Sequence, residues 1–194
     1  MQYPIELRFK LLTFGQQITA TDASGKMLMY IKQKMFRLKE KVEIYADTSQ
    51  SSLLFTIAAD RVIDFSANYH FADAQGTDWG AVCRKGMRSL WSAHYQVMQG
   101  GQVDATIDEE SPMKKVLEAI LGEIPVLGFV AVWLLNPSYI VRSPAGTELL
   151  RLIKRPAVFE GKYTLEKLAD MSEDDELRCL MALIMLVLLE RRRG

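Results

Sequence analysis

The stretch that most constrains the fold of this 194-residue chain lies near its carboxyl end, where eleven consecutive apolar residues occupy 179–189. Four acidic residues precede this run at 173–176, and three arginines follow it at 191–193. Carboxylates favour the positive N-terminal end of a helix dipole, and cations favour the C-terminal end. Ser172 is placed to cap the first turn. The pattern predicts a helix with no polar face, so we expect it to be buried on every side.

Length separates a core helix from a membrane span. At 1.5 Å per residue, a helix over 177–189 is about 20 Å long, whereas a span needs roughly 20 apolar residues to cross a hydrocarbon core about 30 Å thick. Arg178 also interrupts the start of the apolar run. We therefore expect a core helix, and a tail anchor or interfacial segment is the alternative.

Five segments before this helix share the outline of a β-hairpin: a short strand, a polar or Gly-containing turn, and a second strand that ends in an aliphatic residue. Asp and Ser start such turns by bonding their own backbone, and Gly permits the positive φ that closes them. The segments are 18–31, 43–57, 69–82, 95–107 and 139–153, with turns at 22–25, 47–50, 73–76, 100–101 and 143–146.

Further strand-like stretches lie between these hairpins, at 6–13, 63–66, 87–91 and 158–165. Ten or more short strands at this spacing are typical of a β-barrel or a β-sandwich. Strands of five to six residues span about 17–20 Å, which is close to the expected length of the C-terminal helix. We therefore expect a mainly β fold, with a barrel that encloses the hydrophobic helix.

The region 111–137 breaks the β pattern. Ser111 and Pro112 form an N-cap and N1 pair, and apolar residues at helical spacing follow them. Twelve uncharged residues then occupy 124–135, among them Phe129 and Trp133. We expect one domain over 1–194 with a helical insertion near 111–135 that packs over one barrel end. The alternative is a surface around Phe129 and Trp133 that contacts a membrane or a protein partner.

The charge balance limits the classes of partner. Twenty-four basic and twenty-four acidic residues cancel, so we do not expect a nucleic-acid partner. The first nine residues contain Glu6 and Arg8 and no continuous apolar stretch, which predicts a cytoplasmic protein without a signal peptide. Cys83 and Cys179 have neither disulfide nor metal-ligand spacing, and we expect both to be structural.

No residue pattern predicts catalysis. His70 and His94 lie in strand-like segments, where a structural histidine is much commoner than a catalytic one. Phosphate-binding glycine loops, nucleophile elbows and Cys/His metal motifs are all missing. We therefore predict a non-catalytic protein with no cofactor and no metal site. An acidic cluster has no metal-binding pattern and is expected to be a solvated hairpin edge: Asp104, Asp108, Glu109 and Glu110.

Two basic clusters favour a binding function. Lys32 and Lys34 share one face of a predicted strand, since alternate residues point the same way, and Arg37 follows in the next turn. Basic side chains hold phosphate oxygens, and each contributes roughly 1 kcal/mol beside an anionic bilayer. We predict binding of an anionic lipid headgroup or membrane surface; the alternative is a strand edge whose lysines discourage aggregation. The second cluster is Arg84, Lys85 and Arg88.

Serial hairpins with Asp-x-x-Gly turns, followed by a hydrophobic C-terminal helix, resemble the LURP-one-related family. The resemblance is carried by 9–46 (FKLLTFGQQITATDASGKMLMYIKQKMFRLKEKVEIYA), by 139–168 (YIVRSPAGTELLRLIKRPAVFEGKYTLEKL) and by the terminal helix, and it leaves out about 111–137. It implies the fold shared with tubby C-terminal domains and phospholipid scramblases, a closed antiparallel barrel of about twelve strands around one hydrophobic helix.

Biochemical roles differ across that superfamily. Tubby-like domains bind phosphoinositide headgroups, and scramblase-like members are linked to lipid movement. Taken together with the two basic clusters, the resemblance favours binding of an anionic lipid or membrane surface, with peripheral membrane contact. Because the chain lacks a calcium-loop motif, no lipid-scrambling activity is inferred. The alternative function is a protein-interaction or oligomer-forming adaptor that uses the insertion around Phe129 and Trp133.

Overall fold

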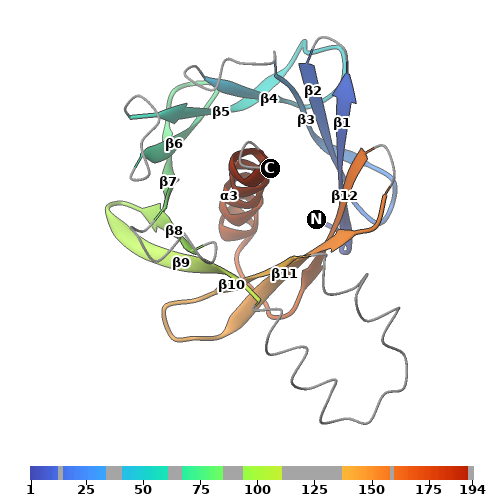
Figure 1. Cartoon of the computed structure of the whole chain (residues 1–194). Helices are drawn as coiled ribbons and strands as arrows, with labels where there is room; N and C mark the ends of the chain where they lie inside the picture. The colour runs from blue at the N-terminus through green and yellow to red at the C-terminus, as the bar shows by residue number, and fades with distance from the viewer. Residues whose placement is uncertain are drawn as a thin grey trace, which may run out of the picture.

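A computed structural model describes residues 1–12, 15–33, 41–60, 67–84, 94–110, 137–157 and 160–191 of the chain. In these residues, twelve antiparallel strands close into one barrel, and the helix α3 (Glu173–Arg191) lies inside it (Figure 1). The mainly β fold, the closed barrel and the enclosed C-terminal helix that the sequence predicts are all confirmed.

Each strand pairs with the next strand in the chain, and β12 returns to pair with β1. The closing register runs from Ile5 opposite Leu165 to Lys10 opposite Glu160. All five predicted hairpins are present, as β2–β3, β4–β5, β6–β7, β8–β9 and β10–β11. The strands are β1 (Ile5–Leu12), β2 (Gly15–Thr21), β3 (Met27–Gln33), β4 (Val42–Tyr45), β5 (Leu53–Ala59), β6 (Asn68–Asp73), β7 (Asp78–Arg84), β8 (His94–Gln99), β9 (Gln102–Glu109), β10 (Ser138–Arg142), β11 (Glu148–Arg155) and β12 (Glu160–Lys167).

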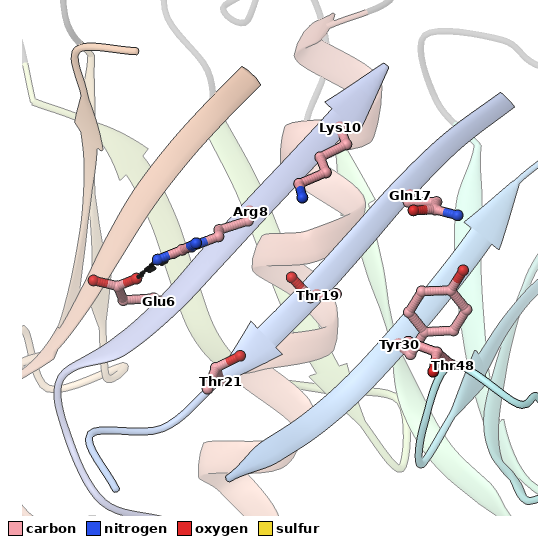
Figure 2. A pocket seen from close by; sticks show the side chains of 8 residues that line it. All are labelled: Glu6, Arg8, Lys10, Gln17, Thr19, Thr21, Tyr30 and Thr48. Atoms are coloured by element: carbon pink, nitrogen blue, oxygen red, sulfur yellow. Dashed lines mark hydrogen bonds and ion pairs between the residues drawn. The ribbon is translucent and has the colours of Figure 1, made fainter. Parts of the chain in front are cut away.

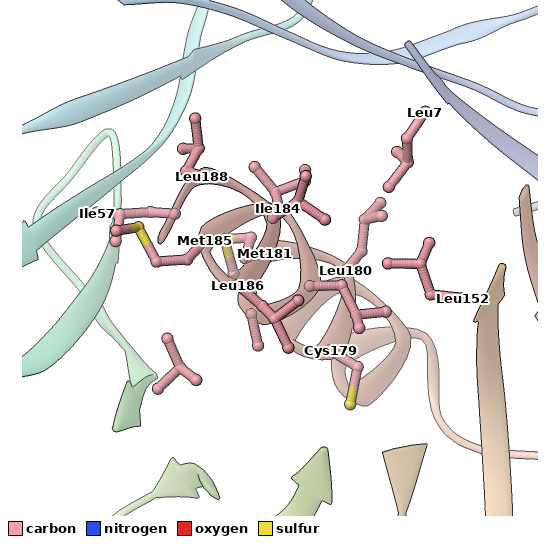
Figure 3. Close-up of a cluster of buried hydrophobic side chains, with 14 of the residues drawn as sticks. Leu7, Ile57, Leu152, Cys179, Leu180, Met181, Ile184, Met185, Leu186 and Leu188 are labelled. Carbon is pink, nitrogen blue, oxygen red and sulfur yellow. The ribbon is translucent and has the colours of Figure 1, made fainter. Parts of the chain in front are cut away.

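Strand side chains alternate between the lumen and the outer face of the barrel. On β1, Ile5, Leu7 and Phe9 are at most 2% exposed and belong to the core, whereas Glu6 and Arg8 lie outside. On α3, every residue over 178–188 is at most 2% exposed. Figure 3 shows the apolar side chains of this helix among those of the surrounding strands. Each buried Leu, Ile or Met side chain contributes about 1.5–3 kcal/mol to folding, so α3 is the centre of the core.

The start of α3 follows the sequence prediction. The Ser172 hydroxyl accepts a hydrogen bond from the backbone nitrogen of Asp175 at 3.1 Å, which caps the first turn. Four carboxylates stand in that turn, at the positive end of the helix dipole. Of the three terminal arginines, those at 192 and 193 lie outside the described residues.

The two ends of the barrel differ in how strands are joined. Short turns join the strands at the end where α3 begins, which we call the turn end, and the structure describes all of these turns. At the opposite end, which we call the connection end, part of every strand-to-strand connection lies outside the described residues. There Glu190, near the end of α3, accepts a hydrogen bond from the Tyr95 hydroxyl at 2.8 Å.

Three turns at the turn end share one construction, as the Asp-x-x-Gly pattern predicts. A side-chain oxygen at the first position accepts a hydrogen bond of 2.8–3.2 Å from the backbone nitrogen four residues later. A glycine with φ of 85–89° stands three positions after the first residue. The β4–β5 turn opens on Asp47 but has Gln50, with φ of 58°, in the glycine position. The first residues are Asp22, Asp73 and Ser143, and the glycines are Gly25, Gly76 and Gly146.

Several sequence predictions fall outside the described residues. These are the helical insertion near 111–135 and the strand-like stretches at 63–66 and 87–91. No helix in the described part of the chain combines the length and the apolar character needed to cross a bilayer.

Candidate functional site

The lumen is occupied by α3 and by the apolar side chains that pack around it. A polar ligand is costly to bury among such side chains, so its site is expected on the outer face or at an end of the barrel. A groove on the outer face of β1, β2 and β3 meets this expectation (Figure 2).

The groove has a volume of about 420 Å³, which is within the usual range for a small-molecule site. Each lining residue carries a polar group: there are one carboxylate, two cations, one amide, three threonine hydroxyls and one tyrosine. Seven lining residues come from β1, β2 and β3, and the eighth comes from the β4–β5 turn. They are Glu6, Arg8, Lys10, Gln17, Thr19, Thr21, Tyr30 and Thr48.

Strand register arranges these side chains in three rows. Neighbouring strands are about 4.8 Å apart and successive rows are about 7 Å apart, so the rows form a regular grid on the outer face. The row nearest the turn end is acidic, the middle row holds an arginine, and the third row has a lysine on each side. From the turn end, the rows are Glu6–Thr21, Arg8–Thr19–Tyr30 and Lys10–Gln17, and Lys32 of β3 extends the third row beyond the lining residues.

Glu6 and Arg8 pair with each other inside the groove. The Arg8 guanidinium donates to Glu6 Oε2 from Nη2 at 3.0 Å and from Nε at 3.4 Å. Lys162 of β12 places Nζ 3.3 Å from Glu6 Oε1. Hydrogen bonds from Arg8 and Lys162 hold the pKa of the Glu6 carboxyl below its usual range, so Glu6 is ionised at neutral pH. The Arg8 side chain is 49% exposed, which leaves it within reach of a ligand.

Lys10 and Lys32 are the cations of the third row, and both are exposed. Within the described residues, neither lysine forms an ion pair. Two carboxylates lie nearby on flanking strands. Glu160 stands opposite Lys10 on β12, and Glu43 on β4 accepts a hydrogen bond from the Tyr45 hydroxyl at 2.7 Å. The third row therefore carries two positive charges that no described acid neutralises by direct contact.

Tyr30 is the aromatic residue of the groove lining. It lies on the outer face, opposite Thr19 on one side and Tyr45 on the other, yet only 3% of it is exposed. The ring is therefore covered by neighbouring side chains and forms part of the groove wall rather than an open aromatic surface. The groove thus combines cations, hydroxyl and amide groups, and one ring.

The first predicted basic cluster meets this groove at one residue. Lys32 lies on β3 opposite Gln17 and completes the third row. Lys34 and Arg37 lie outside the described residues. They follow β3 in the chain, and β3 ends at the connection end, towards which the third row also lies. The anionic-ligand site predicted at Lys32, Lys34 and Arg37 therefore stays a prediction. Of its three residues, the structure describes Lys32, which stands beside the groove.

Arg84 is the described residue of the second predicted cluster, and it does not line the groove. Arg84 ends β7, on another part of the wall, and its guanidinium carbon is 5.9 Å from the centroid of the Tyr95 ring. Lys85 and Arg88 lie outside the described residues, as do Phe129 and Trp133 of the predicted interaction surface. Ligand binding at the second cluster and an adaptor role for the insertion both stay predictions.

Sequence reasoning missed most of the groove. Arg8 and Lys10 alternate with buried residues on β1, and Gln17, Thr19 and Thr21 do the same on β2. This period-two pattern of polar residues was the available signal, because it places each set on one face of a strand. The pattern alone does not predict the register between β1 and β2, which places their outward polar side chains next to each other.

The acidic residues of β9 are not a solvated edge, contrary to the sequence prediction. β9 pairs with β8 and β10 inside a closed sheet, so its outward carboxylates have neighbours on both sides. Asp108 contacts His94 Nδ1 and lies 3.7 Å from Arg142 Nη1. Glu110 is bonded to Arg151 at 3.2 Å and to Ser138. Asp104 turns to the core side and binds Arg178 at 2.8 Å.

The histidines and cysteines lie apart from the groove. His70 is an exposed residue of β6, and His94 belongs to the charged network with Asp108 on the outer face of β8 and β9. Cys179 is buried in α3, where burial raises the pKa of its thiol to about 12. Cys83 is partly exposed on β7. Among the described residues, no three His, Cys, Asp or Glu side chains are grouped so as to hold a metal ion.

Comparisons with protein-family models, with curated proteins and with solved structures give no match to this chain. The resemblance to the LURP-one-related family therefore stays a prediction. The candidate site rests on the geometry of the groove.

Proposed function

We propose that this protein is a non-catalytic binding module whose β1–β3 groove takes the anionic headgroup of a lipid at a membrane surface. The observation that supports this most is the third row of the groove, where Lys10 and Lys32 flank Gln17 without a described ion-pair partner. Arg8 stands one row away and lines the groove with Lys10, and Lys32 stands beside the lining residues on β3.

The side chains of the groove suit the chemistry of a phosphate-bearing headgroup. Arg presents a planar fork of donors, and Lys acts as a compact charge that adjusts its position. The hydroxyls of Thr19 and Thr21 and the amide of Gln17 add neutral donors between the charges.

Three cations are enough for membrane binding that is weak and reversible. Each Lys or Arg close to an anionic bilayer contributes about 1 kcal/mol, and the attraction fades within a Debye length of about 8 Å at physiological salt. Peripheral contact is thus the form of membrane association that we propose. The resemblance to a superfamily with lipid-binding members agrees with this proposal, as an analogy of fold.

Vesicle sedimentation tests the proposal. We expect the wild-type protein to sediment with phosphatidylcholine vesicles that contain an anionic lipid and to stay in solution with phosphatidylcholine alone. The double variant Lys10→Gln, Lys32→Gln should lose about 2 kcal/mol of binding, which is about 30-fold in affinity. A soluble phosphate ester that competes with the vesicles would identify the phosphate as the recognised group.

Lys26→Gln is the matched control, because it removes one positive charge from the β2–β3 turn, just beyond the groove. If the groove binds the headgroup specifically, Lys26→Gln should bind anionic vesicles nearly as tightly as the wild-type protein does. The proposal fails if anionic and neutral vesicles recover equal amounts of wild-type protein at low salt. It also fails if Lys26→Gln weakens binding as much as Lys10→Gln does.

A further inference from the structure

The β4–β5 turn, residues 46–52, forms the part of the groove wall that does not belong to β1, β2 or β3. Thr48 lines the groove from this turn, whereas the other seven lining residues lie on the three strands (Figure 2). The turn is longer than the other four hairpin turns, and a hydrogen bond of 2.9 Å from the Ala46 nitrogen to the Ser52 carbonyl oxygen closes it. It therefore brings a residue of a neighbouring hairpin to a site built on β1–β3.

The hydroxyl of Thr48 differs in its contacts from two other hydroxyls of the same turn. Ser49 Oγ bonds Asp47 Oδ1 at 2.5 Å and Ser51 Oγ at 2.9 Å, so these two serines hold the turn together. No group in the described part of the chain forms a hydrogen bond with the Thr48 hydroxyl. Thr48 is also exposed. Its hydroxyl is thus accessible, and the shape of the turn does not depend on it.

We infer that Thr48 is a phosphorylation site and that its phosphate closes the groove to anionic ligands. A protein kinase supplies the phosphoryl group from ATP. Thr48 Oγ attacks the terminal phosphorus, the bond from that phosphorus to the bridging oxygen breaks to release ADP, and a base of the kinase takes the hydroxyl proton. The inference rests on the proposed function, and it names a regulation of the same site.

The phosphate reverses the charge of the groove. The lining residues Glu6, Arg8 and Lys10 together carry a net charge of one positive unit. A phosphothreonine adds about 1.5 to 2 negative charges and three strong acceptor oxygens. The net charge of the lining becomes negative, so an anionic headgroup is repelled. The phosphate is also tethered beside the cations, where its effective concentration exceeds that of a free ligand.

The turn can carry a phosphate without losing its shape. Asp47, the acid next to Thr48, accepts hydrogen bonds from the backbone nitrogen of Ser49 at 2.7 Å and from its hydroxyl at 2.5 Å. These bonds direct the Asp47 carboxylate to Ser49, within the turn. Because the turn is exposed, water and salt weaken the repulsion between this carboxylate and the phosphate.

Mass spectrometry tests whether the modification occurs. One sample is the protein purified from its source cells, and the other is the recombinant full chain incubated with ATP and a lysate of those cells. We expect a phosphate on Thr48 in at least one sample, and Thr48→Ala should remove the corresponding peptide signal. Unmodified Thr48 in both samples overturns the inference.

Vesicle binding tests the effect of the phosphate. Full-length protein with phosphothreonine incorporated at position 48 is compared with unmodified protein, on phosphatidylcholine vesicles that contain phosphatidylglycerol. We expect about 30-fold weaker binding, the equivalent of two basic contacts. Thr48→Glu adds a single charge and should weaken binding about fivefold.

Ser52→Glu is the matched control, because Ser52 belongs to the same exposed turn and does not line the groove. We expect this variant to bind the same vesicles within about twofold of wild type. If Ser52→Glu and Thr48→Glu weaken binding equally, the added charge acts only through the general field of the protein, and the inference is overturned.

A 31P titration measures the contact without any lipid. Cations favour the doubly charged form of a phosphate, so the second pKa of phosphothreonine at position 48 should be about one unit lower in the folded protein than in urea. Phosphoserine at position 52 should show less than half that shift. Equal shifts at the two positions overturn the inference. If wild-type protein binds no anionic vesicle, the proposed function fails, whereas this titration still shows whether the phosphate meets the groove cations.

Discussion

The turn end of the barrel and the β1–β3 groove each hold an arginine against carboxylates, and the two differ in burial. The Arg178 side chain, near the start of α3, is 2% exposed, whereas the Arg8 side chain is 49% exposed. Arg178 donates from Nε to the Trp79 carbonyl at 2.8 Å and from Nη1 to Asp104 at 2.8 Å and Asp175 at 2.5 Å. Among the described residues, Arg8 has one carboxylate partner, Glu6.

Burial decides what each arginine can do. A buried charge is tolerated only when its donors are bonded, so Arg178 is fixed between α3, β7 and β9 and belongs to the framework. An exposed pair contributes little to stability, with a median of about 0–1 kcal/mol, because water and salt weaken it. Arg8 can therefore change partners at small cost, and this freedom is what a binding site needs.

The largest effect is expected from Arg178→Ala. Removing one partner from a buried ion pair typically costs about 3–5 kcal/mol. We expect a loss near the lower end, because the side chains of Asp104 and Asp175 are 32% and 35% exposed and water can reach them. Urea unfolding followed by circular dichroism should show that loss. If the free energy of unfolding falls by less than about 1 kcal/mol, water takes over the contacts of the guanidinium and Arg178 is not part of the framework.

Gly80→Ala comes next, and it tests the β7 segment that receives Arg178. Gly80 has φ of 107°, and an added Cβ would stand 2.2 Å from the Met98 carbonyl oxygen. We expect a loss of about 2–4 kcal/mol, from strain in the backbone and the clash together. Gly76→Ala is the control, since Gly76 has φ of 85° but nothing within 4 Å, and it should cost only about 1 kcal/mol. Equal losses would exclude the clash as a cause.

Gln50→Gly should stabilise the protein. Gln50 has φ of 58° in the β4–β5 turn, where three similar turns place a glycine. Relief of this strained conformation should add about 0.5–1 kcal/mol to the free energy of unfolding, less the extra entropy that glycine gives the unfolded chain. A thermal melt measures the gain. A lower melting temperature would show that the entropy of the unfolded chain outweighs the strain.

Arg8→Gln is expected to have the smallest effect on stability, within about 0.5 kcal/mol, because the Arg8–Glu6 pair is exposed. The same urea unfolding experiment measures it beside Arg178→Ala. A loss comparable with that of Arg178→Ala would contradict the distinction between a framework arginine and an exchangeable one.

The parts of the fold that the sequence predicts depend on local signals. Ser172, the four acids after it and the apolar run over 179–189 define α3 within one segment of chain. The hairpin turns are equally local, since Asp22 or Asp73 bonds a backbone nitrogen four residues away. Such signals need no knowledge of the rest of the chain, and the structure confirms them.

The parts that the sequence does not predict depend on contacts between distant residues. Arg178 looks like an interruption of an apolar helix, and its partners Trp79 and Asp104 are 99 and 74 residues away. The closing of β12 on β1 brings Lys162 to Glu6 in the same way. Lys32 was predicted as a binding residue, but its neighbours Lys10 and Gln17 became visible only with the register of β1, β2 and β3.

The position of α3 after all twelve strands has a consequence during synthesis. While a ribosome is still making residues 173–191, the strands that have already emerged have no central packing partner. Their lumen-facing residues, such as Leu7, Ile18 and Ile31, are then exposed in the nascent polypeptide. The core therefore cannot assemble before α3 has emerged, and we expect this protein to depend on chaperones that shield apolar strands until the helix arrives.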